Sequence, residues 1–98
     1  MQKGAWLIQG YDGLTRVLKR RVSSALSDTE IKALLQHLVA SGLSPSDIIA
    51  ASLRRNMKGY SPLLEVRQEL RQRTIYWCGE NPHYTASYHT DYEFKDMD

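Results

Sequence analysis

The chain has 98 residues, of which 42% are hydrophobic and 24% are charged, and its net charge is +2. This composition is typical of one globular domain, and no apolar run approaches the roughly 20 residues that a membrane-spanning helix needs. The first residues lack the apolar run of an export signal, and the single cysteine excludes an intramolecular disulfide. We therefore expect a cytoplasmic protein without a membrane segment.

The N-terminal quarter predicts an extended segment followed by a basic helix. The letters AWLI at residues 5–8 indicate a short strand or extended segment that packs Trp6 on a bundle of helices. A helix of about 12 residues is expected next, because apolar side chains recur there at helical spacing. Its apolar positions are Leu14, Val17, Leu18, Val22 and Ala25, and its basic residues are Arg16, Lys19, Arg20 and Arg21.

Capping sequences predict the starts of three further helices at Ser27, Ser44 and Ser61. Ser27 is followed three residues later by Glu30, the spacing of a capping box in which both side chains accept backbone hydrogen bonds. A proline follows the second and the third serine, and proline is favoured at the first helical position. Glycines after the first two segments indicate where those helices end.

The third of these helices is expected to extend toward Trp77, with arginines on its surface. Its apolar side chains are Leu63, Val66 and Leu70, and its arginines are Arg67, Arg71 and Arg73. Together the elements predict an all-α fold, mainly a small bundle of about four helices with an extended N-terminal segment.

Residues 79–98 differ in character from residues 1–78, so the sequence predicts a helical domain followed by an acidic, aromatic tail. Residues 1–77 carry twelve Lys or Arg and six Asp or Glu, whereas residues 78–98 carry one lysine and five acids. Tyr84, Tyr88 and Tyr92 recur at every fourth position, which would align them in a helix. We expect the tail to be disordered alone or to become ordered on a partner.

Residues 34–56 resemble the helix-turn-helix of bacterial repressors. Gly42 stands where that family needs a residue tolerant of positive φ, and Leu43 and Ile48 stand at the inward positions beside the turn. Ala51 matches the small packing position. The resemblance implies that Ser44 caps a recognition helix that reads DNA.

The outward positions of this unit favour burial over base recognition. Ile49, Ala50 and Leu53 would face the DNA groove, yet they carry none of the hydrogen-bonding groups that read base edges. A helix that is apolar around most of its circumference is typically buried. We therefore expect a central core helix from about residue 45 to 57, and we keep a helix-turn-helix transcriptional regulator as the alternative.

No set of residues has the spacing of an enzyme active site or a metal site. Cys78, His83, His89 and Asp91 are the nearest approach to a ligand set, but they lack the close cysteine pair of a structural zinc site. Cys78 and His83 lack an orienting third group for nucleophilic catalysis. The sequence predicts no enzyme, no catalytic residue, no bound metal and no cofactor.

Clustered arginines and aromatic side chains predict a binding function, since Tyr, Trp and Arg dominate interface energetics. The leading hypothesis is a small non-enzymatic protein that docks on and modulates a larger macromolecule, such as a bacterial nucleic-acid-handling protein or complex, as phage-type inhibitors do. Direct nucleic-acid contact through phosphates is a second expectation. The expected contact residues are Arg16, Lys19, Arg20, Arg21, Arg54, Arg55, Arg67, Arg71, Arg73, Trp77, Tyr84, Tyr88 and Tyr92.

Overall fold

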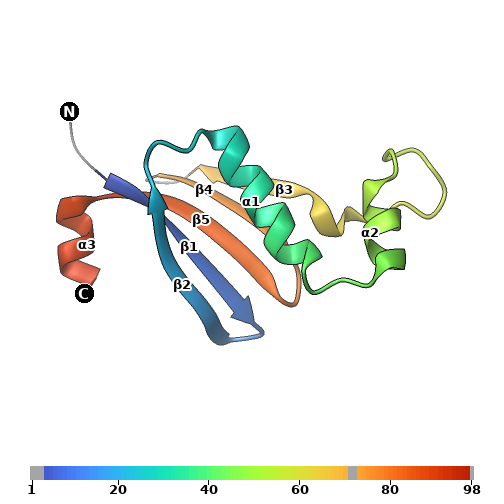
Figure 1. Ribbon diagram of the computed structural model, residues 1–98, viewed down its shortest axis with the longest axis horizontal. Helices are drawn as coiled ribbons and strands as arrows, with labels where there is room; N and C mark the ends of the chain where they lie inside the picture. The colour runs from blue at the N-terminus through green and yellow to red at the C-terminus, as the bar shows by residue number, and fades with distance from the viewer. Residues whose placement is uncertain (1–3, 71–72, 98) are drawn as a thin grey trace.

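An antiparallel sheet lies at the centre of the computed structural model, which describes residues 4–70 and 73–97 (Figure 1). The strands of these residues are β1 (Gly4–Asp12), β2 (Thr15–Ser23), β3 (Val66–Leu70), β4 (Thr74–Gly79) and β5 (His83–Thr90), in the order β2-β1-β5-β4-β3. The helices are α1 (Asp28–Ala40), α2 (Pro45–Ser52) and α3 (Asp91–Met97), with a 3₁₀ turn η1 (Pro62–Leu64) before β3.

The expected all-α bundle is therefore wrong, and the helix expected after the N-terminal segment is strand β2. Residues of β2 pair with β1 from Ala5↔Ser23 to Asp12↔Thr15. Leu18 and Val22 are four residues apart, a spacing that places two side chains on one face of a helix and also on one face of a strand. Their apolar pattern fits both structures, and the hairpin pairing with β1 selects the strand.

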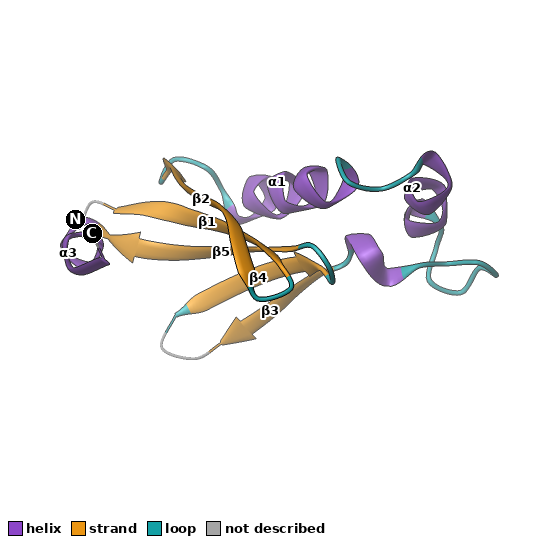
Figure 2. Cartoon of the chain, turned by 90° about the horizontal axis from the view of Figure 1, so that it is seen from below, coloured by secondary structure: helices purple, strands orange, loops and turns teal. Residues whose placement is uncertain are grey.

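One face of the sheet forms the core against α1, which lies along that side in Figure 2. Even-numbered strand residues point toward the helix, because side chains alternate between the faces of a strand. Arg16 is the exception, since a register shift between Gly10 and Tyr11 places it opposite Tyr11. Trp6 is 6% exposed, donates its indole N–H to the carbonyl of Leu26 at 3.2 Å, and meets Tyr88 edge to face. The other buried members of the cluster are Ile8, Tyr76, Cys78 and Ala86 of the sheet and Ile31, Leu35 and Val39 of α1.

The caps of α1 and α2 are confirmed, but the predicted role of α2 is wrong. Ser27 and Glu30 form the capping box of α1, and Ser44 caps α2. Helix α2 ends at Ser52 and has no buried residue, and Ile49 is 65% exposed. It projects past the sheet at the end opposite to α3 (Figure 1). The sheet, not α2, supplies the centre of the core, so neither a helical bundle nor a helix-turn-helix describes this protein.

The C-terminal residues that were expected to form a loose tail provide a central strand. β5 lies between β1 and β4, with Ala86 opposite both Ile8 and Tyr76. The chain then forms α3, whose Phe94 is 2% exposed. The helix expected from Ser61 to Trp77 is instead the turn η1 followed by β3 and β4. Within the described residues, none of the helices has both the length and the apolar character to span a membrane.

Candidate functional site

The second face of the sheet, opposite α1, carries a row of polar, basic and aromatic side chains. The pairing register places Arg67, Trp77, Thr85, Gln9 and Lys19 side by side across strands β3, β4, β5, β1 and β2. A second row contains His83 and Tyr11, followed by Arg16 on β2. We call these eight residues the open face.

Trp77 is the largest side chain at the centre of the open face. Its indole is half-buried, and the guanidinium carbon of Arg67 lies 4.9 Å from the ring centroid, within the range of a cation–π contact. An open depression of about 490 Å³ adjoins the ring, and its lining also includes Ile75, His83, Thr85 and the acidic residues Glu69 and Glu80. The arrangement leaves an aromatic surface beside a cation and an open hollow that also carries two acidic side chains.

A second aromatic surface is formed by Tyr11 and His83. Their rings stack with centroids 5.2 Å apart and an interplanar angle of 15°. The turn after β1 is linked to the turn after β4, because the backbone N–H of Gly13 donates to Asn81 Oδ1 at 2.8 Å. This hydrogen bond joins the turn that follows Tyr11 to the turn that precedes His83.

Helix α3 covers the other end of this sheet face. Phe94 packs against the imidazole of His89, and the guanidinium carbon of Arg21 lies 4.0 Å from the Phe94 ring centroid. Thr90 and Glu93 exchange two hydrogen bonds at the start of the helix, in the pattern of a capping box. Because α3 occupies this end, the accessible part of the face is the part that holds Trp77, Tyr11 and His83.

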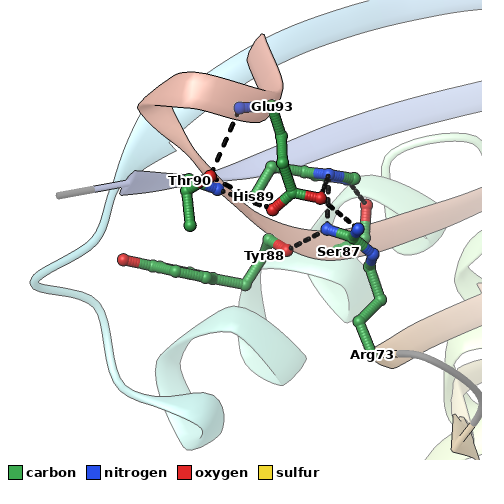
Figure 3. A network of polar contacts seen from close by, with 6 residues as sticks. All are labelled: Arg73, Ser87, Tyr88, His89, Thr90 and Glu93. Atoms are coloured by element: carbon green, nitrogen blue, oxygen red, sulfur yellow. Dashed lines mark hydrogen bonds and ion pairs between the residues drawn. The ribbon is translucent and has the colours of Figure 1, made fainter. Parts of the chain in front are cut away.

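Polar contacts centred on Arg73 attach α3 to the sheet (Figure 3). The Arg73 guanidinium donates to the Tyr88 carbonyl at 2.9 Å, contacts His89 Nδ1 at 2.7 Å and forms an ion pair with Glu93. Since arginine only donates, His89 Nδ1 accepts, and Nε2–H donates to Ser87 Oγ at 2.7 Å. The network therefore requires a neutral His89.

The two titrating groups of this network have lowered pKa values. Burial, and then the charge of Arg73, lower the pKa of His89 below its ordinary value of 6.5. Hydrogen bonds from Arg73 and from the Thr90 backbone lower the pKa of Glu93 to about 2. Both lowered values mean that the native state disfavours protonation of these groups.

We expect stability to fall in two stages on acidification. Unfolded His89 takes up its proton near pH 6.5 but folded His89 resists it, so its contribution is complete above pH 6.5 and is lost as pH falls through its lowered folded pKa. The Glu93 contribution is complete above pH 4.5 and is lost toward about pH 2. Thermal unfolding midpoints measured from pH 8 to pH 3 test this.

Two variants show whether His89 itself causes the fall in stability between pH 7 and pH 5. H89Q removes the titrating imidazole, so its midpoint should change less between pH 7 and pH 5 than that of the parent protein. The control is H37Q, since His37 is an exposed histidine of α1. Equal pH dependence of H89Q and H37Q would contradict the role given to His89.

The structure brings together only some of the residues expected to bind a partner. Arg16, Lys19, Arg67 and Trp77 lie on the open face, whereas Arg20, Tyr84 and Tyr88 lie on the face toward α1. Arg21 contacts Phe94 and Arg73 holds α3. Arg54 and Arg55 follow α2, and Arg55 forms an ion pair with Glu65. Tyr92 is exposed on α3. Arg71 lies outside the described residues.

Four residues of the open face were missed from the sequence. Gln9, Tyr11, His83 and Thr85 gain their positions only through pairing between strands distant in sequence. Alternation within HYTASYHT and GAWLIQGYD was the available signal, since a strand period assigns odd-numbered residues to one face. A helical interpretation of the same residues does not place these side chains on one face.

The residues considered as metal ligands or nucleophiles do not converge. Cys78 is buried on the α1 side, and burial raises the pKa of its thiol to about 11. His83 and His89 lie on the opposite face, six residues apart along β5, and Asp91 begins α3. Cys78 is therefore a protonated packing residue at neutral pH.

Comparison with known proteins adds no family to this description. No protein-family model matches the chain, and neither a curated protein nor a solved structure matches it.

Proposed function

We propose that this protein is a non-enzymatic binding protein that docks on a larger macromolecule through the open face and modulates it. The observation that carries the proposal is the row in which Arg67, Trp77 and Lys19 share one face of the sheet. Trp, Tyr and Arg are enriched at the centres of interfaces because they combine large contact area with polar groups. A partner that handles or contains nucleic acid suits the basic side chains.

The charge of β2 supports an anionic partner. This edge strand carries Arg16, Lys19, Arg20 and Arg21 and no acidic residue, and all four are exposed. Such a strand attracts polyanions over a Debye length of about 8–10 Å at physiological salt.

Affinity capture tests this function with two matched variants. W77A removes the central aromatic side chain, so a stoichiometric partner retained by the parent protein should be lost. I49S alters an exposed apolar residue on α2, away from the open face, and should retain the partner. The captured material is to be analysed for protein and for nucleic acid, with and without nuclease. Absence of any stoichiometric partner, or equal retention by W77A and the parent, would reject the proposal.

A further inference from the structure

We infer that the open face binds single-stranded nucleic acid directly, with bases stacked on Trp77 and on the Tyr11–His83 pair. This inference rests on the proposed function and specifies its partner. It joins three observations about the described residues: two aromatic surfaces on one sheet face, cations along the adjoining edge strand, and polar side chains between them.

The two aromatic surfaces are suitably placed for neighbouring bases. Trp77 lies opposite Thr85, and His83 is two residues from Thr85 on the same strand, so Trp77 and His83 are diagonal neighbours. Diagonal positions on one sheet face are about 7–8 Å apart. Two bases of one strand can therefore each contact an aromatic ring without a large change in the protein. Base stacking on aromatic side chains is the main sequence-tolerant attraction in single-strand binding.

Polar groups between the rings suit the edges of unpaired bases. Thr85 and Gln9 occupy the row from Trp77 toward β2, and both are partly exposed. A hydroxyl and a side-chain amide each donate and accept hydrogen bonds. Unpaired bases expose the Watson–Crick edges that such groups can contact, whereas these edges are occupied in a duplex.

Cations on both sides of the aromatic surfaces match a phosphate backbone. Arg16 and Lys19 lie on the open face at the β2 edge, and Arg67 lies at the β3 edge. Glu93 and Asp91 of α3 lie at the other end of the sheet, where they disfavour a polyanion. Glu69 and Glu80 line the depression beside Trp77, so the most basic part of the open face is the β2 edge with Arg16 and Lys19.

Single strands fit this surface better than duplex DNA. Recognition in the major groove uses a protruding helix or β-ribbon with hydrogen-bonding side chains. The projecting helix α2 contains no lysine or arginine and has Ile49 as its most exposed large apolar residue. Aromatic rings on a sheet need unstacked bases, which a single strand offers without the energy of opening a duplex.

Fluorescence anisotropy with labelled oligonucleotides of about 12 nucleotides tests the inference. We expect the parent protein to bind oligo(dT) or mixed-sequence DNA or RNA single strands more tightly than a duplex of the same length. W77A should weaken binding tenfold or more, because the stacking surface is lost. Y92A, which removes an exposed tyrosine from α3, is the matched aromatic control and should bind like the parent protein.

Salt dependence supplies a second measurement. If Arg16, Lys19 and Arg67 contact phosphates, the logarithm of the affinity should fall with the logarithm of salt concentration with a slope of about −2. K19E should weaken binding to every single strand and reduce that slope, whereas W77A should leave the slope nearly unchanged. Circular dichroism spectra establish that each variant is folded.

The outcomes distinguish this inference from the proposed function. Absence of binding to every DNA and RNA strand, equal affinity for duplex, or binding that W77A leaves unchanged would each overturn the inference. If strands fail to bind but W77A abolishes capture of a nuclease-resistant protein partner, the open face binds protein and the proposed function stands alone. If capture also fails, both are rejected.

Discussion

Replacing Trp6 with alanine is expected to lower the free energy of unfolding by about 3–5 kcal/mol, the usual cost of truncating a large buried aromatic residue. The indole is 6% exposed, lies edge to face with Tyr88, and packs in the cluster with Tyr76 and Ile31. Truncation leaves a cavity between the sheet and α1 and removes the donor to the Leu26 carbonyl. Urea denaturation followed by circular dichroism measures the change.

Two further variants show whether the loss comes from packing at this site. W6F keeps an aromatic ring but lacks the indole N–H, so it should destabilise less than W6A. W77A truncates the other tryptophan, which lies half-buried on the open face, and should also cost less. A W6A loss no greater than that of W77A would contradict the position of Trp6 in the core.

Replacing Gly79 with alanine is expected to destabilise the protein by about 2–6 kcal/mol. Gly79 ends β4 with φ of +88°, a left-handed conformation that costs a residue with a Cβ about 1–3 kcal/mol. A Cβ would also lie 2.7 Å from the Pro82 carbonyl oxygen and 2.9 Å from Val39 Cγ2. Relieving such overpacking costs about 1–3 kcal/mol more.

Gly59 provides a control with the same backbone angle and open surroundings. Its φ is also +88°, but the nearest heavy atom to an added Cβ is Leu53 Cδ1 at 4.0 Å. G59A should therefore show only the backbone cost, and the difference between G79A and G59A in chemical denaturation should give the steric contribution. Equal losses would contradict the close approach between the β4–β5 turn and α1.

Local signals in the sequence predicted those features whose causes are local. The capping box at Ser27 and the cap at Ser44 depend on side chains and backbone groups within three residues of each other, and both helices begin as expected. The sequence predicts that the second helix ends near residue 57, but α2 ends at Ser52 and the following residues lead to η1. The next cap, Ser61, starts only a 3₁₀ turn.

The sheet could not be predicted because its decisive contacts are distant in sequence. Tyr84 and Tyr88, like Leu18 and Val22, are four residues apart, and this spacing fits a helix and a strand equally. What selects a strand for Tyr88 is its pairing with Trp6, more than 80 residues earlier in the chain. The charge pattern also led to a wrong prediction. The acidic residues among residues 79–98 indicated a solvated tail, although β5 itself contains no acidic residue.

Only part of the candidate site could be predicted from the sequence, because its residues are brought together by strand pairing. Trp77, Arg67 and Lys19 were expected to bind because of their chemistry, which requires no knowledge of the fold. Their grouping with Tyr11 and His83 depends on the register of four strand pairs. The separation of Tyr84 and Tyr88 from them follows from the alternation of β5, which directs these two tyrosines toward α1.

The central position of β5 also determines when the protein can fold during its synthesis. β1 and β2 form one local hairpin, and β3 and β4 form another, but within the sheet each hairpin is paired with β5 and not with the other hairpin. A ribosome that has not yet released residues 83–90 therefore holds two hairpins that share no strand and a core that lacks Ala86. The open face does not exist at that stage, because its rows cross β5. A partner that contacts both rows of the open face therefore requires β5 to be paired within the sheet.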